Sequence, residues 1–307
     1  MANYGIIDCG SNTVRLCIYR VEEKKKRYRK RDIRSLLNHK KMVGLSAHVE
    51  NGVMTQRGIE RACEVINDHL ARAEYFKCKQ LDVFATAFLR NCDNSEEALG
   101  AIQQGTGTAV NLLSAHDEAH LGFIGASCAE EGMDDGVLID IGGGSTELTR
   151  LRTQGDFDNI SIAQGSLSSF AQHVALMLPT QAEMTAITDE FQGHVLGNSL
   201  YKGVQCDTVY GIGGSARGIA KIYGEMFCNG KQPQEVTLGQ IEQVLDCCRN
   251  DPGFFIHCAL KAAPDRIHTA VPGCLIATEV MRDFHAKRLK ICKCGVREGY
   301  LIDRMLP

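Results

Sequence analysis

The chain has 307 residues, of which 44% are hydrophobic, and its formal net charge is −3. This length is enough for two domains of ordinary size, each with its own core. The small negative charge argues against a general attraction to DNA or other polyanions, so any polyanion must be bound by local basic groups. No apolar run approaches about 18 residues, and Met1 leads directly into a strand pattern. We therefore expect a cytoplasmic protein without a signal peptide or a membrane partner.

The first predicted element is a hairpin over residues 4–21. An apolar strand ends at Asp8, a turn of small residues follows, and a second strand returns. Small residues let backbone N–H groups approach a ligand closely, and successive N–H groups form an anion-binding nest. The candidate anion-binding residues of this hairpin are Gly10, Ser11, Asn12 and Arg15. For Arg15 the alternative is a solvent-facing position on the strand.

A run of charged residues over 22–34 follows the hairpin. If the second strand leaves the small-residue turn at Asn12, this run lies beyond the far end of that strand. Its side chains would then be roughly 25–30 Å from the turn, at about 3.3 Å per residue. We interpret the run as a solvated turn, with a remote contact to a long polyanion as the alternative.

Helix and strand patterns then alternate up to residue 129. Apolar spacing predicts a helix over 55–76, a strand over 81–85, a helix over 95–104, a strand over 110–114 and a helix over 123–129. Arg90 lies in the turn between the first of these strands and the helix that follows. Glu118 lies between the second strand and the last helix. Both positions are also typical of helix capping, which is the alternative role for each residue.

Residues 137–149 repeat the order of the first hairpin: apolar strand, Asp140, small-residue turn, second strand. Asp8 and Asp140 are 132 positions apart, which suggests two like domains facing each other across a cleft. The turn residues Gly142, Gly143, Gly144 and Ser145 are the second set of candidate anion-binding residues. A carboxylate beside an anion nest requires a cation, and Mg²⁺ favours a mixture of carboxylate, water and phosphate oxygens. We expect Asp8 and Asp140, with Glu147 on the returning strand, to hold Mg²⁺ directly or through water.

A third glycine motif follows an apolar strand over 206–212. Its candidate binding residues are Gly213, Gly214 and Ser215. The chain then reads as helical to about residue 288, with Arg266 six residues before Pro272. A last strand is predicted over 289–294 and a final helix over 299–306. The expected domains are 1–121 together with 297–307, and 122–296.

These motifs resemble the first and second phosphate motifs and the third glycine motif of the actin, sugar kinase and heat-shock chaperone superfamily. Within it, the chain is most similar to the exopolyphosphatase / guanosine pentaphosphate phosphohydrolase family, over about residues 4–304. The resemblance implies an α/β fold with two ribonuclease-H-like, actin-like ATPase domains flanking an active-site cleft. It implies that Glu118 activates water and that Arg90 and Arg266 contact phosphate. It also matches the segment 297–299 to a closing Arg-Glu-Gly motif, whereas His120 departs from the Arg often found at that position.

The implied function is metal-dependent, processive release of terminal orthophosphate from inorganic polyphosphate. One alternative is hydrolysis of guanosine pentaphosphate, with guanosine penta- or tetraphosphate as partner. A second is a non-catalytic sensor of alarmone or polyphosphate. A kinase is disfavoured, because Glu118 in this context points to water as the acceptor. A homodimer is one expectation for the oligomeric state.

Fourteen cysteines are scattered through apolar segments. In a cytoplasmic protein, buried reduced thiols are more typical than a disulfide scaffold. Cys292 and Cys294 would share one face of a strand, but a zinc site needs two more ligands and no matching pair is evident. We therefore expect core or surface thiols here.

Overall fold

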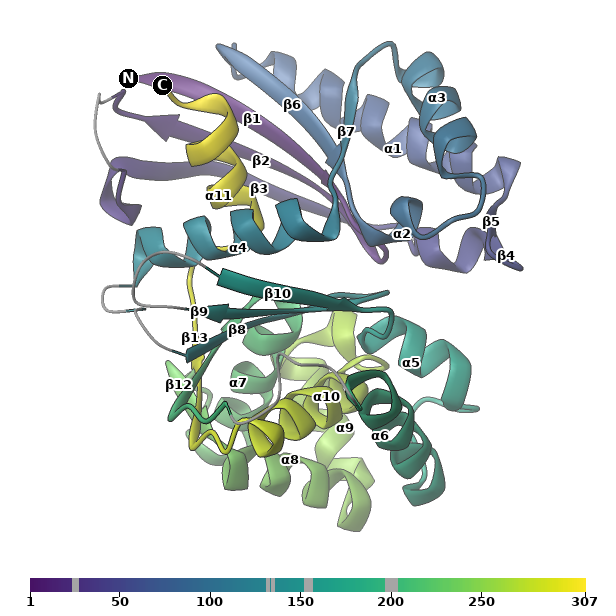
Figure 1. Cartoon of the computed structure of the whole chain (residues 1–307), viewed down its shortest axis with the longest axis vertical. Helices are drawn as coiled ribbons and strands as arrows, with labels where there is room; N and C mark the ends of the chain where they lie inside the picture. The colour runs from purple at the N-terminus through teal and green to yellow at the C-terminus, as the bar shows by residue number, and fades with distance from the viewer. Residues whose placement is uncertain (24–27, 131–132, 134–135, 152–156, 197–203) are drawn as a thin grey trace. The chain divides into compact units, whose positions relative to one another are not determined.

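A computed structural model describes the chain except for residues 24–27, 131–132, 134–135, 152–156 and 197–203 (Figure 1). It divides into two compact units. Unit 1 comprises Met1–Ala129 and Cys294–Pro307, and unit 2 comprises Glu130–Lys293. Among the described residues, no helix is both long and apolar enough to cross a membrane.

Unit 1 is built on a five-stranded mixed sheet, as far as the structure describes it, with the strand order β3-β2-β1-β6-β7. Its strands are β1 (Ala2–Cys9), β2 (Thr13–Val21), β3 (Ile33–Met42), β6 (Gln80–Ala85) and β7 (Val110–Leu112), and a small ribbon is formed by β4 (Val49–Glu50) and β5 (Val53–Met54). The first three strands are antiparallel, while β6 and β7 run parallel to β1. The helices are α1 (Gln56–Glu74), α2 (Ala87–Arg90), α3 (Ser95–Thr106), α4 (Ala115–Ala129) and α11 (Val296–Tyr300), and α11 continues into a π-helical turn over Leu301–Met305.

The central strands β1 and β6 of unit 1 carry apolar side chains on both faces, because helices cover both. Ile7 and Val83 belong to the cluster beneath α1 and α3. Their sequence neighbours Ile6 and Phe84 belong to a second cluster, which includes Leu121 of α4 and residues after Val296. Alternation of side chains along a strand produces this division, and it makes the C-terminal residues part of the core of unit 1.

Unit 2 has a six-stranded sheet in its described part, with the order β10-β9-β8-β11-β13-β12. Its strands are β8 (Gly136–Ile141), β9 (Thr146–Leu151), β10 (Phe157–Ile162), β11 (Thr208–Ile212), β12 (Glu235–Thr237) and β13 (Arg288–Ile291). Its helices are α5 (Ser166–His173), α6 (Gln181–Val195), α7 (Gly213–Phe227), α8 (Leu238–Asn250), α9 (Pro252–Ala262) and α10 (Ala270–Asp283). Helices α6 to α10 share one hydrophobic cluster with strands β8 and β11.

The two sheets have the same connectivity. Three antiparallel strands are followed by two parallel strands on the other side of the first, and unit 2 adds β12 as an antiparallel edge strand. This arrangement confirms the predicted α/β class with two ribonuclease-H-like domains. The expected domain boundary fell at residue 121. Helix α4 runs through that position to Ala129 and belongs to unit 1.

Three local expectations differ from the structure. Helix α4 begins at Ala115 because Ser114 caps it, its hydroxyl accepting the Asp117 N–H at 3.0 Å. The stretch predicted as helical after residue 213 contains β12, which is too short to show a strand period. The last helix begins at Val296 because Glu298 caps its first turn through the Gly295 N–H. The basic residues 24–27 lie outside the described residues, between β2 and the 3₁₀ turn at Lys30–Asp32.

Candidate active site

The turn between β1 and β2 is held in one orientation by the segment after β3. The Gly10 N–H donates to the Thr13 carbonyl at 3.0 Å and closes the turn. The carbonyls of Ser11 and Asn12 accept N–H groups from the segment 43–46, at 3.0–3.1 Å. A trans peptide places each N–H opposite the preceding carbonyl, so the N–H groups of Asn12 and Thr13 point away from that segment.

The turn between β8 and β9 is built in the same way. The Gly142 N–H donates to the Ser145 carbonyl at 2.9 Å. The carbonyls of Gly142 and Gly143 accept N–H groups from the first residues of α5, 166–168, at 2.8–2.9 Å. The N–H groups of Gly143 and Gly144 therefore point away from α5, which is the arrangement that the predicted anion-binding nest requires.

The two turns can be compared by the direction of their backbone N–H groups. Gly10 and Gly142 close their hairpins, and these two positions are again 132 apart. In both units the carbonyls are bound by the segment that follows the third strand. The outward N–H groups belong to residues 12–13 and 143–144, so the structure adds Thr13 to the predicted set. Sequence gives no signal for the direction of an individual peptide.

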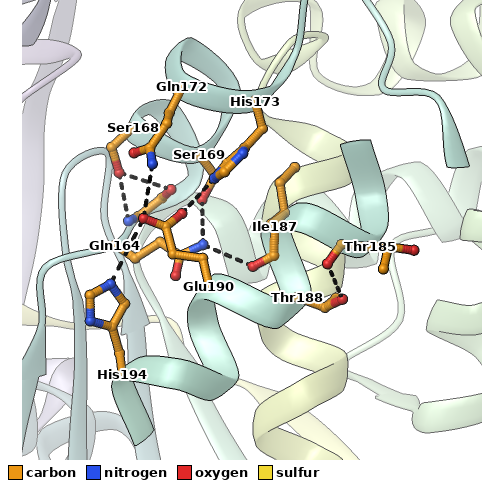
Figure 2. Close-up of polar contacts among 11 residues, drawn as sticks. Gln164, Ser168, Ser169, Gln172, His173, Thr185, Ile187, Thr188, Glu190 and His194 are labelled. Carbon is orange, nitrogen blue, oxygen red and sulfur yellow. Dashed lines mark hydrogen bonds and ion pairs between the residues drawn. The ribbon is translucent and has the colours of Figure 1, made fainter. Parts of the chain in front are cut away.

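Helix α5 is itself fastened to α6 through buried polar contacts (Figure 2). The Gln164 side-chain amide donates to Ser169 Oγ at 3.1 Å and to the Ile187 carbonyl at 3.0 Å. On the exposed side of the same pair of helices, His173 Nε2 lies 2.6 Å from Glu190 Oε2. The Gln164 carbonyl accepts the Thr146 hydroxyl at 2.7 Å. These contacts fix the N-terminus of α5 against the turn that it orients.

Asp140 and Glu147 are directly opposite each other in the β8–β9 register, so their side chains share one face of the hairpin. Glu147 is buried, and its Oε1 accepts the hydroxyls of Ser145 at 2.7 Å and Ser161 at 2.9 Å. Two carboxylates in this arrangement repel each other unless a cation lies near them. No described group of three or more His, Cys, Asp or Glu side chains could hold a metal. The pair nevertheless fits Mg²⁺, which often uses one or two carboxylates and completes its shell with water and phosphate.

In unit 1 the two equivalent positions are occupied by an acidic and a basic residue, rather than by two acidic residues. Asp8 is directly opposite Arg15, at the position that Glu147 occupies in the repeat. Asp8 Oδ2 also accepts a hydrogen bond from Arg297 Nη1 at 2.8 Å, and both side chains are 19% exposed. Burial opposes the charge of Arg297, but Asp8, Cys17, Tyr19 and Glu298 together outweigh it and raise the pKa of this guanidinium. Asp8, predicted as a metal ligand, is thus already compensated by protein cations, whereas Asp140 faces a second carboxylate.

Arg15 lies opposite Asp8 in the β1–β2 register and also contacts the neighbouring strand β3. Its Nη1 donates to Asn38 Oδ1 at 2.6 Å. Burial, and then the positive charge of Arg297, lower the pKa of Arg15. Arg15 is thus half-buried, opposite Asp8 on one side and bonded to Asn38 on the other.

The closing Arg-Glu-Gly segment supplies the partner that sequence analysis did not assign to Asp8. Arg297 reaches Asp8, while Glu298 accepts the Tyr19 hydroxyl at 2.7 Å and the Gly295 N–H at 2.9 Å. A Cβ on Gly299 would collide with the Leu121 carbonyl, so only glycine allows this helix to approach α4. The family resemblance includes this segment, and the fold shows that Arg297 contacts Asp8 at the end of β1.

The third glycine motif lies against the second turn. Gly213 has φ of 77° and leaves no room for a Cβ, because the Asp140 carboxylate packs on it. Gly214 is similarly covered by the Arg266 guanidinium. The Ser215 hydroxyl donates to the Ile141 carbonyl at 2.7 Å. Unit 2 therefore gathers the second turn, Asp140, Glu147 and Arg266 around the start of α7.

Arg90 and Glu118 are brought together in unit 1. Arg90 Nη1 donates to Glu118 Oε2 at 2.8 Å and to the Leu113 carbonyl at 2.9 Å. The side chains are 17% and 12% exposed, so the pair is mostly shielded from water. Glu118 occupies the first turn of α4, and His120, one residue beyond Ala119, lies 3.5 Å from Asp303. The carboxylate is thus held by a cation and a helix N-terminus together.

Comparison with known proteins gives consistent matches along the chain. The model of the Ppx/GppA phosphatase family matches residues 18–307. Exopolyphosphatase 1 of Mycobacterium bovis is 22% identical over 308 residues, which cover 98% of this chain and 88% of that protein. The crystal structure of an exopolyphosphatase from Cytophaga hutchinsonii matches with a TM-score of 0.82 at 17% identity, over 98% of this chain and 96% of the other. The Aquifex aeolicus member of the Ppx/GppA family matches with a TM-score of 0.76 at 22% identity, with the same coverage.

Proposed function

The chain belongs to the Ppx/GppA phosphatase family, and on that premise we propose that it hydrolyses terminal orthophosphate from inorganic polyphosphate. The observation that carries this proposal is the repeated turn, in which each unit directs two adjacent backbone N–H groups outward beside an aspartate. Two such turns in one chain suit a substrate that carries many phosphates and no other recognition group.

Glu118 is proposed to orient the attacking water and to accept its proton as the terminal phosphoanhydride breaks. Arg90, at 2.8 Å from Glu118 Oε2, keeps this carboxylate in place. Its guanidinium would also stabilise negative charge on the phosphoryl group that is transferred to water. The leaving group is the shortened polyphosphate chain.

Asp140 and Glu147 would hold Mg²⁺, because their carboxylates are directly opposite each other on one face of the β8–β9 hairpin. When bound, the ion would supply positive charge that offsets the phosphate oxygens. Asp8, which Arg297 already neutralises, would contribute only through water. Arg266 at the start of α7 would bind a further phosphate of the chain.

The crevice beside the third glycine motif bears on where a guanine base could bind. The crevice beside Arg266, lined also by Ser215 and Gly273, holds about 10 Å³, which is on the order of one water molecule. A guanine base does not fit in this crevice. Orthophosphate release with Mg²⁺ should therefore be measured in parallel on short polyphosphate, long polyphosphate and guanosine pentaphosphate. Faster release from the pentaphosphate would favour the nucleotide activity, and binding without release from any substrate would favour a sensor.

Glu118→Gln tests the catalytic assignment. It preserves the shape of the side chain, and its amide oxygen can still accept from Arg90, but it cannot take a proton from water. Turnover should fall by about 10²–10⁴, with the fold and phosphate binding retained. Glu96→Gln is the matched control, since Glu96 is an exposed carboxylate in the first turn of α3. Turnover within a few-fold of the unmodified protein would refute the role of Glu118.

A further inference from the structure

The chain passes between the units twice, and the two passages leave unit 1 side by side. The first follows Ala129 at the end of α4, and the second returns at Cys294. A Cβ on Gly125 would collide with the Gly295 carbonyl, so the two backbones are in contact here. Cys128 lies one residue before the first passage and three after Gly125, on the same face of α4.

This packing brings two thiols together. Cys294 directly precedes Gly295, and each of the two thiols has the largest influence on the pKa of the other, as expected of neighbouring side chains. Cys294 is 1% exposed, whereas Cys128 is half-buried and more accessible. The Cys294 thiol lowers the pKa of Cys128, against the effects of burial and of the Glu298 charge, and the Cys128 thiol raises the pKa of Cys294. Lys30 favours the thiolate of Cys128, and Asp32 opposes it.

The same two passages are also joined on the side of unit 2. Lys290 Nζ lies 2.9 Å from Glu130 Oε2, and Glu130 directly follows Ala129. The segments around 125–130 and 290–295 are therefore paired by backbone contact, by two thiols and by an ion pair. A covalent bond between the thiols would fix this pairing.

We propose that Cys128 and Cys294 are a redox modification site, which forms a reversible disulfide that ties the two passages together. The Cys128 thiolate attacks a low-molecular-weight disulfide, RSSR, and releases one RS⁻ as a mixed disulfide forms. Cys294 then loses its proton, attacks the Cys128 sulfur and releases the second RS⁻. Two cysteine thiols are oxidised, and one RSSR is reduced to two RSH. The half-buried thiol of Cys128 reacts first, and the buried thiol of Cys294 resolves the intermediate.

The test uses the intact reduced protein and oxidised glutathione as the probe. Remaining thiols are alkylated, the protein is digested without reductant, and crosslinked peptides are identified by mass spectrometry. We expect the Cys128–Cys294 peptide to appear before other crosslinks and to disappear with dithiothreitol. Glutathione retained on Cys128 without a crosslink, or crosslinks confined to other cysteines, would overturn the proposal.

Two variants separate the roles of the thiols. Cys294→Ala should trap glutathione on Cys128, because the resolving thiol is gone. Cys128→Ser should leave Cys294 unmodified in the folded protein, since burial shields it. The half-buried Cys78, in the loop between α1 and β6, provides the control, and Cys78→Ser should leave the crosslink unchanged. If Cys294→Ala fails to fold, Cys128→Ser decides alone, and modification of Cys294 in that variant would refute the order of steps.

Discussion

Replacing Gly125 by alanine tests the close crossing of α4 and the segment that precedes α11. In a helix interior, alanine is normally favoured over glycine by about 0.5–1 kcal/mol. At Gly125 the added Cβ would collide with the Gly295 carbonyl, a backbone atom that no rotamer change can move. Overpacking of a core costs about 1–3 kcal/mol. Because the obstacle here is a backbone atom, we expect a cost near the upper end of that range. We expect a net loss of about 2 kcal/mol in the free energy of unfolding.

Gly100→Ala is the matched comparison for this change. Gly100 lies in α3, and a Cβ there would meet nothing within 4 Å. The same substitution should therefore stabilise the protein by about 0.5–1 kcal/mol. The two variants are expected to differ in sign, although both replace a helical glycine by alanine.

Urea unfolding followed by far-UV circular dichroism measures both effects. A change in stability alone shifts the midpoint and leaves the dependence on denaturant unaltered. Gly299→Ala, whose Cβ would meet the Leu121 carbonyl, should resemble Gly125→Ala. If Gly125→Ala instead stabilised the protein as Gly100→Ala does, the helix crossing described here would be wrong.

Three further predictions concern charge. Asp140→Asn or Glu147→Gln should raise the Mg²⁺ concentration needed for half-maximal orthophosphate release by about tenfold or more. Asp158→Asn, an exposed carboxylate on β10, should leave that requirement unchanged, and an unaltered requirement in the first two variants would refute the proposed metal ligands. Arg297→Met should cost about 3 kcal/mol in urea unfolding, because it leaves the Asp8 carboxylate largely buried without its cation. Adding Asp8→Asn should recover part of this loss, whereas additive losses would show that the two residues are not coupled. Stability should also fall below about pH 6.5, because burial lowers the pKa of His69 in the folded protein and the unfolded chain then binds the proton more readily. Urea midpoints measured from pH 7.5 to 5 should show a shallower loss in His69→Gln than in the exposed control His257→Gln, and equal slopes would contradict this origin.

The sequence was informative about the fold because its strongest patterns are local. The apolar strands that end at Asp8 and Asp140 and their small-residue turns predict both hairpins, and each hairpin forms as expected. Helix α1 follows from apolar spacing and the Thr55 cap, whose side chain accepts the Gly58 N–H. By contrast, β12 has only three residues and pairs with β13, so its pairing partner lies far away in the sequence.

For the candidate site, the sequence indicated which residues to consider but not the contacts that they make. Both aspartates were assigned to a metal, since each follows an apolar strand in the same pattern. Their surroundings differ because Arg15 faces Asp8 while Glu147 faces Asp140, and because Arg297 returns from the other end of the chain. Contacts of this kind depend on tertiary structure, for which periodicity and spacing carry no signal.

The path of the chain through unit 1 also bears on how the protein is made. Tyr300 stacks on Phe84 at 5.0 Å between ring centroids, and its hydroxyl accepts from Asn111 at 2.7 Å. Tyr300, like Arg297, is synthesised after the whole of unit 2. Domains usually fold during synthesis in order from the N-terminus. Here unit 2 is continuous in sequence and can complete its core on the ribosome. Unit 1 emerges first, and part of one face of its sheet stays exposed until residues 294–307 are made.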